Sequence, residues 1–324
     1  MEMQLEQDIV KYLSDIIQLI PRQFKIRRGP DGILLFDRRT GVNILIDEFR
    51  LSRELWHMAP RHVSIALTNA CDLNCYHCFA PKCPARLNVE RLIAWLDELE
   101  VNGCIGVGFG GGEPTLYREL PDVCRYVAKH TNMAVTFTTH GHRIDDRLAT
   151  DLKGNVHFIR VSMDGIGATY EKIRKKPFTS LLQQIEVIRE IAPFGINYLI
   201  NHLTLPEIDA AISLVADLGA SEILLLPELP TNRSSGIDNT TKQALQRWVK
   251  SYDGPVPLTV SEAGKEGMPV VNPLPNETGL RAYAHIDASG MLKRSSYDKN
   301  GIPIGTGGVM RAIRVLESMR EVSK

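Results

Sequence analysis

Three cysteines lie close together in the segment TNACDLNCYHCFAP, which covers residues 68–81. The spacing C-x3-C-x2-C brings the thiols of Cys71, Cys75 and Cys78 near one another on one loop. Three thiolates can hold three corners of a four-iron four-sulfur cluster and leave the fourth iron without a protein ligand. An iron of this kind is open to a small molecule, so the segment predicts a reactive iron–sulfur centre.

A structural zinc site is the alternative interpretation of these cysteines. Structural zinc needs four closed ligands, and the nearest candidates for the fourth are His77 and Cys83. The remaining cysteines, Cys104 and Cys124, lie in apolar segments where cysteine acts as a small buried hydrophobic residue. We therefore expect a single cluster in the chain.

A second candidate segment is the run Gly110, Gly111, Gly112, Glu113 and Pro114. Glycines allow backbone groups to approach a ligand closely, and a neighbouring carboxylate can accept hydrogen bonds from an ammonium group. A glycine run alone more often marks a tight turn. Its position after an apolar strand makes a ligand site the better interpretation, because such sites form at strand ends.

Apolar strands and amphipathic helices alternate from residue 62 to about residue 228. We predict strands at 63–68, 105–110, 134–139, 158–163, 197–202 and 222–227, and helices near 88–101, 118–130, 145–153, 178–192 and 207–218. This alternation predicts parallel strands joined by right-handed crossovers, in an α/β fold that forms a partial (β/α)6 TIM-like barrel. Both candidate segments then lie at the same edge of the sheet.

The flanking segments differ from this core in pattern. Residues 1–60 predict a helix over 1–20 and a three-stranded meander over 23–47, and residues 61–260 form the core domain. Residues 261–324 predict an extension with a hairpin near 283–297 and a helix from about 307 to 320. A further helix is expected near 239–251.

The charge balance limits the classes of partner. The chain has 38 basic and 38 acidic residues, so no long-range field favours nucleic acid. No apolar run approaches the ~20 residues that span a bilayer. We expect a cytoplasmic protein without a membrane segment.

The cysteine segment resembles the signature of the radical S-adenosylmethionine (radical SAM) superfamily, and the glycine run is similar to its GGEP element. The resemblance implies one oxygen-sensitive [4Fe-4S] cluster on Cys71, Cys75 and Cys78 whose open iron binds S-adenosylmethionine. Reductive cleavage then gives a 5′-deoxyadenosyl radical that abstracts hydrogen from a substrate, with flavodoxin or ferredoxin as the electron donor. Gly111, Gly112, Glu113 and Pro114 are expected at the methionine amino group.

Later strand ends resemble further elements of the same superfamily. In the third-strand TNG element His140 replaces the usual Asn, and the fourth strand ends in VSMDG. The resemblance implies further contacts to S-adenosylmethionine from His77, Thr139, Ser162, Asp164, Asn197 and Leu226.

The C-terminal segment resembles the SPASM and twitch extensions, which carry auxiliary clusters in related enzymes. This chain has Arg294, Ser295 and Ser296 where those extensions have cysteine. The resemblance therefore implies an extension without its cluster, in which Arg294, Ser295, Tyr297 and Asp298 are candidate substrate contacts or parts of a solvated hairpin. Cys83 and Tyr297 are the candidates for a catalytic hydrogen donor.

The N-terminal meander is similar in pattern to the leader-recognition sheets of peptide-maturing radical SAM enzymes. A peptide substrate is the first hypothesis, and a small metabolite such as a sugar, nucleoside or amino acid is the second. A non-catalytic iron–sulfur or zinc scaffold, or a sensor, is a third hypothesis of another class. The type of reaction stays open.

Overall fold

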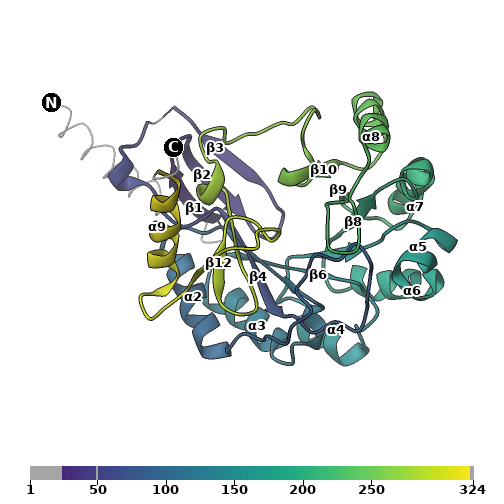
Figure 1. The fold of residues 1–324 in the computed structure, drawn as a ribbon. Coiled ribbons are helices and arrows are strands. Elements are labelled where there is room, and N and C mark those ends of the chain that lie inside the picture. The colour runs from purple at the N-terminus through teal and green to yellow at the C-terminus, as the bar shows by residue number, and fades with distance from the viewer. Residues whose placement is uncertain (1–23, 49, 322–324) are drawn as a thin grey trace.

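The computed structural model describes residues 24–48 and 50–321. Its central sheet is built on six parallel strands, which lie side by side in chain order (Figure 1). These are β4 (His62–Thr68), β5 (Gly106–Gly111), β6 (Ala134–Thr139), β7 (Phe158–Ser162), β8 (Phe194–Ile200) and β9 (Ile223–Pro227). Each pairs in parallel with the next. The α/β prediction of a partial TIM-like barrel is confirmed, and all six predicted strands are present.

Helices follow these strands along the outer side of the sheet (Figure 1). They are α2 (Val89–Val101), α3 (Leu120–His130), α4 (Asp146–Leu152), α5 (Gly167–Arg174), α6 (Phe178–Arg189), α7 (Ile208–Asp217) and α8 (Asn239–Ser251). The sequence prediction missed α5, because this short helix begins at a glycine that weakens its helical signal. Alternate strand residues such as Val63, Ile65 and Val107 are fully buried beneath the helices and form the main core.

Additional strands extend the sheet at both edges. β10 (Leu258–Val260) pairs in parallel with β9, and β11 (Tyr283–Ile286) pairs in parallel with β4. β12 (Met291–Lys293) and β13 (Ile302–Pro303) then continue the sheet in antiparallel pairing. Within the described residues the end strands β10 and β13 pair only on one side, so the sheet is open. The final helix, α9 (Gly308–Glu321), packs against α2.

A separate antiparallel sheet precedes the core, as the meander pattern predicts. It consists of β1 (Phe24–Gly29), β2 (Gly32–Asp37) and β3 (Asn43–Ile46). Arg27 fixes β1 to the rest of the chain, because its buried guanidinium donates to Glu277 at 2.9 and 3.1 Å and to the carbonyl of Gly103 at 2.8 Å. The helix predicted over 1–20 lies outside the described residues, and the predicted domain boundaries stay a prediction.

Within the two described ranges, no helix is long and apolar enough to cross a membrane.

Candidate active site at the carboxyl ends of the strands

The cysteine segment forms a loop between β4 and α2. Hydrogen bonds from Asn69 to the carbonyls of Ala85 and Cys83, at 3.0 Å each, close the base of this loop. All three signature cysteines are free thiols, and Cys75 is buried whereas Cys71 and Cys78 are partly exposed. Burial raises the pKa of the Cys71 and Cys75 thiols, so metal binding here must displace protons.

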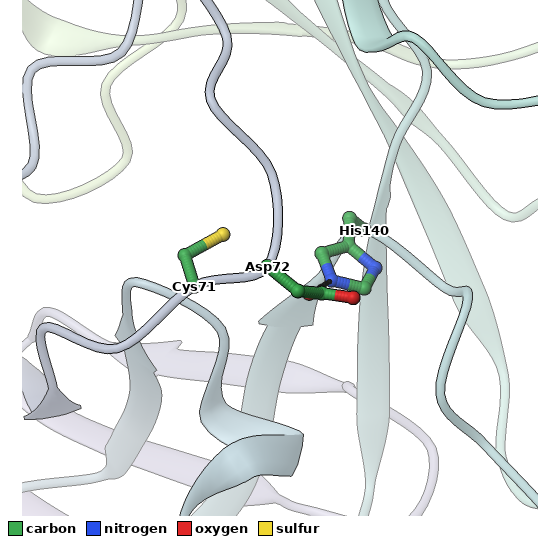
Figure 2. A group of neighbouring side chains, drawn as sticks. All are labelled: Cys71, Asp72 and His140. Atoms are coloured by element: carbon green, nitrogen blue, oxygen red, sulfur yellow. Dashed lines mark hydrogen bonds and ion pairs between the residues drawn. The ribbon is translucent and has the colours of Figure 1, made fainter.

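The thiols do not form a zinc-sized group. A tetrahedral zinc site with sulfur ligands about 2.3 Å from the metal brings its sulfurs to within roughly 4 Å of one another. Among the described residues, the group that is compact enough for a single ion has ligand atoms within 4.8 Å and includes neither Cys75 nor Cys78. It consists of Cys71, Asp72 and His140 (Figure 2).

The two candidate fourth ligands for zinc are engaged elsewhere or exposed. The Nε2 atom of His77 lies 3.0 Å from a carboxylate oxygen of Asp164, and Cys83 is exposed with its sulfur 3.8 Å from the amide of Asn69. Three thiols spread along one loop fit the corners of a cubane cluster better than a mononuclear site.

The carboxylate of Glu113 lies at the end of β5 and is 1% exposed. Its Oε1 atom accepts hydrogen bonds from the backbone amide and the hydroxyl of Thr115, at 3.1 and 2.7 Å, and from the hydroxyl of Thr139 at 2.8 Å. Its Oε2 atom accepts from the backbone amide of His140 at 2.9 Å. These donors are uncharged, so they hold the carboxylate in place and leave its charge for a cationic partner. The adjacent Pro114 is buried at the start of a short 3-10 helix.

Glycines bring the end of β5 against the cysteine loop. The amides of Gly112 and Glu113 donate to the carbonyls of Thr68 and Ala70 at 2.7 and 2.8 Å. A Cβ atom on Gly111 or Gly112 would lie 2.2 Å from one of these carbonyl oxygens, and Gly111 has a φ of +126°. Only glycine fits this crossing.

His140 links the same loop to the end of β6. Its Nδ1 accepts from the amide of His142 at 3.1 Å, so its Nε2 carries the proton that it donates to Asp72 at 2.8 Å. Burial would raise the pKa of Asp72, but hydrogen bonds from His140 and Arg143 outweigh burial and hold that pKa at about 2. Asp72 was not among the predicted site residues, although its place beside Cys71 is a signal that could have found it.

Asp164 is a buried anion at the end of β7. The Nε atom of Arg174 lies 2.5 Å from its Oδ2 atom, and His77 reaches the same oxygen. Burial would raise the pKa of Asp164, but Arg174 and His77 outweigh burial and lower it to about 2. The Nδ1 atom of His77 is buried and has no hydrogen-bond partner within the described part of the chain.

The remaining predicted contacts lie on neighbouring strands. Ser162 and Asn197 face each other across β7 and β8, and the side chain of Asn197 lies 3.5 Å from a guanidinium nitrogen of Arg160. Leu226 is a half-buried residue of β9. The structure therefore brings the predicted residues to one edge of the sheet, and their contacts to a cofactor stay a prediction.

A second loop, after β9, also holds the cysteine loop and was missed by sequence reasoning. Arg233 donates to the side chain of Asn74 at 2.8 Å and to the carbonyl of Cys75 at 2.5 Å. The buried carboxylate of Glu228 accepts from Asn201 at 2.7 Å, and Asn201 also donates to the hydroxyl of Tyr76 at 2.9 Å. No local motif predicts such contacts between segments distant in sequence.

The C-terminal extension reaches the cysteine loop as well. The ring of Tyr297 lies 4.4 Å from the ring of Phe79, which follows Cys78. Burial raises the pKa of Tyr297 to about 12. This places one candidate hydrogen donor beside the cysteine loop, whereas the other, Cys83, is exposed on that loop.

Comparison with known proteins agrees with this geometry. A sequence profile described as the Radical SAM superfamily matches residues 65–218. The chain is 31% identical over 159 residues to an Fe-coproporphyrin III synthase of Methanosarcina barkeri, covering 47% of this chain and 40% of the relative. It is 27% identical over 220 residues to the mycofactocin maturase MftC of Mycobacterium tuberculosis, covering 64% of this chain and 54% of the relative. The chain thus spans about half the length of these curated relatives.

A solved structure supports the fold. The crystal structure of Streptococcus suis SuiB bound to precursor peptide SuiA matches with a TM-score of 0.71 and 12% identity, over 90% of this chain and 87% of that chain. Over residues 65–218 this chain is similar to the radical SAM superfamily, and the arrangement of the cysteine loop beside Glu113 agrees with that similarity.

Proposed function

We propose that this chain is a radical SAM enzyme that acts on a peptide. The observation that carries the proposal is the juxtaposition of three free thiols on one loop with the buried carboxylate of Glu113. When bound, a [4Fe-4S] cluster would supply the electron that cleaves S-adenosylmethionine to methionine and a 5′-deoxyadenosyl radical. Flavodoxin or ferredoxin is the proposed source of that electron.

Each group at the strand ends has a defined task in this proposal. Cys71, Cys75 and Cys78 would hold the cluster, and Glu113 would accept hydrogen bonds from the methionine ammonium group. An ammonium–carboxylate pair in a buried site is stronger than one in water, because the local dielectric is low. Arg233 and His140 keep the cysteine loop in place through Cys75 and Asp72.

The peptide part of the proposal draws on the relatives and on the N-terminal sheet. A mycofactocin maturase is among the relatives, and SuiB, a neighbour in fold, is described with a precursor peptide. In this chain β3 is an edge strand; Ile44 within it is 45% exposed, and Val42 just before it is 47% exposed. An exposed edge can bind an extended peptide by strand addition.

A small-metabolite substrate is the second candidate, because another relative is an Fe-coproporphyrin III synthase. The two candidates differ in the substrate that stimulates turnover. A peptide encoded beside the gene would stimulate the enzyme in the first case, and a tetrapyrrole precursor of Fe-coproporphyrin III would do so in the second.

Anaerobic reconstitution tests the enzymatic proposal. We expect the dithionite-reduced protein to produce 5′-deoxyadenosine from S-adenosylmethionine, and the triple change of Cys71, Cys75 and Cys78 to Ala to abolish this product. If the reconstituted protein makes no 5′-deoxyadenosine, or if the triple variant makes as much as the wild type, a cluster scaffold or sensor is the better interpretation.

Point variants test the role of the N-terminal sheet better than truncation does. Deletion of residues 1–60 would leave Glu277, which is 3% exposed, without its partner Arg27. We instead expect Ile44→Asp to weaken binding of the neighbouring precursor peptide, while Val271→Asp serves as a matched control because Val271 is 92% exposed on a loop. Equal peptide binding by both variants would exclude strand addition at β3.

A further inference from the structure

The inner face of the open central sheet, opposite the helices, is partly exposed at the start of β4. Along β4 the inner residues His62 and Ser64 are partly exposed, whereas Val63 and Ile65 on the helix side are fully buried. The register places Ser64 level with Gly108 of β5, and Thr136 of β6 continues this layer. A complete barrel fills this space with side chains, so the open sheet leaves an inner surface that a ligand can reach.

The ring of His62 lies on this inner surface, in a position that two glycines of β5 make possible. Its ring lies across β5, where a Cβ atom on Gly106 or Gly108 would be 3.5 or 3.0 Å from it. Within the described ranges no group forms a hydrogen bond with either ring nitrogen of His62, and the residue as a whole is partly exposed. Burial, assisted by Arg160, lowers the pKa of His62 to about 4. The neutral ring therefore offers one free donor and one free acceptor.

The C-terminal extension adds the neighbouring wall of this surface. The ring of Tyr283 on β11 stacks on His62 with a centroid distance of 6.2 Å and an interplanar angle of 8°. His285, also on β11, has its Nδ1 atom 3.2 Å from the hydroxyl of Ser64. Burial lowers the pKa of His285 to about 4, so this ring is neutral as well.

The charged groups beside this wall are already paired. Arg160 forms an ion pair with Glu222, and Lys293 lies 2.8 Å from Asp287. Arg61, which precedes His62, lies 3.8 Å from the buried carboxylate of Glu277. An anionic ligand such as a porphyrin carboxylate or a phosphate would need an unpaired cation, whereas an amide needs a neutral donor and acceptor.

We infer that His62, Tyr283 and His285 form a substrate-specificity wall that binds an uncharged amide group of the substrate. The inference rests on the proposed function and narrows its substrate class to peptide backbone or side-chain amides. It also gives the extension a role that needs no cluster, since β11 carries two of the three residues.

Binding of two simple probes tests the inference. Acetyl-glycyl-glycinamide supplies neutral amides, and coproporphyrin III supplies carboxylates. In holoprotein carrying isotope-labelled histidine, we expect the blocked dipeptide to shift the ring signals of His62 saturably. We expect His62→Phe to weaken its binding roughly three- to ten-fold, the worth of one net hydrogen bond.

Matched variants keep the outcome clear. His62→Gln keeps a donor and an acceptor and should bind the dipeptide within about two-fold of the wild type, and the exposed His130→Phe should bind like the wild type. The inference is overturned if His62→Phe binds the dipeptide unchanged, or if coproporphyrin III alone shifts the His62 signals. Binding is measured without cleavage of S-adenosylmethionine, so a failure to form 5′-deoxyadenosine would count against the proposed function and not against this wall.

Discussion

The Nε2 atom of His140 lies 2.8 Å from Asp72 Oδ1 and 3.4 Å from Glu113 Oε2. One side chain at the end of β6 therefore contacts Asp72 of the cysteine loop (Figure 2). It also contacts the carboxylate that follows β5. The related TNG element has Asn at this position, so the chain carries a larger ring where a short amide is usual. The ring reaches Asp72 and so connects the segments that follow β4, β5 and β6.

Removing the imidazole ring of His140 tests whether its contacts support the cysteine loop. We predict that His140→Ala lowers the iron and sulfide retained after reconstitution and gel filtration, because Arg143 is then the one side-chain partner that Asp72 keeps among the described residues. Loss of an outer-shell partner typically costs about ten-fold or more in metal affinity. His130→Ala, on the exposed end of α3, is the control. Equal iron content in His140→Ala and the control would show that the loop needs no support from β6.

Glu113→Gln tests the charge that the site offers. The change keeps the shape of the side chain. Its new NH2 group would face hydrogen-bond donors in either orientation: Thr115 and Thr139 at the position of Oε1, or the backbone amide of His140 at the position of Oε2. We predict that affinity for S-adenosylmethionine falls by about ten-fold or more, since a charge-assisted hydrogen bond is lost. Equilibrium dialysis of the reconstituted protein measures this affinity, and the iron content should stay at the wild-type level. Unchanged affinity would remove Glu113 from the binding site.

Local patterns predict much of this molecule. The six core strands and five of the helices follow from the alternation of apolar and polar residues, and the cysteine and glycine segments are found because they follow strand ends. These features depend on residues near one another in sequence. The pairing of β11 with β4 joins residues more than 200 positions apart, and no local periodicity encodes it.

The same limit applies to the site. Predicted residues such as Glu113 and Asp164 lie at the expected strand ends, but their partners come from elsewhere. Arg174 belongs to the helix that the sequence prediction missed, and Arg233 lies in a loop without a motif. A charged residue in a loop is normally solvated, so only the folded structure identifies those that are drawn into the site.

The ion pair between Arg27 and Glu277 is a test of how the N-terminal sheet is held. Both side chains are nearly fully buried, at 1% and 3% exposure. We predict that Arg27→Met destabilises the protein by about 3–5 kcal/mol, because it removes both hydrogen bonds to the buried carboxylate of Glu277 and leaves it the more distant Arg61, at 3.8 Å. Chemical denaturation of the wild type, Arg27→Met and the double variant Arg27→Met/Glu277→Leu measures the effect.

The double variant should recover much of the lost stability, since it removes both buried charges. A loss below about 1 kcal/mol in Arg27→Met would match an exposed ion pair instead. That result would mean that the meander is loosely attached.

Acid sensitivity should come partly from His157, which lies before β7. Its Nδ1 atom accepts the backbone amide of Val135 at 3.1 Å, and protonation of that nitrogen would break the bond. Burial, assisted by Arg38, lowers the pKa of His157 from 6.5 to about 4. As the pH falls, His157 is therefore protonated in the unfolded chain before it is protonated in the folded protein. The contribution of the neutral His157 side chain to the free energy of unfolding is complete above about pH 6.5 and is lost as the pH falls towards 4.

His157→Asn keeps an acceptor for the amide of Val135 but cannot titrate in this range. We predict that the urea midpoint of the variant falls less steeply than that of the wild type between pH 6.5 and 4, measured on cluster-free protein so that acid loss of iron does not contribute. His202→Asn is the control, because His202 is exposed after β8 and its replacement should leave the slope unchanged. If His157→Asn keeps the wild-type slope, other histidines must account for the acid sensitivity. His57 and His285 are examples, because burial lowers the pKa of each to about 4 and each therefore also takes up a proton more readily in the unfolded chain.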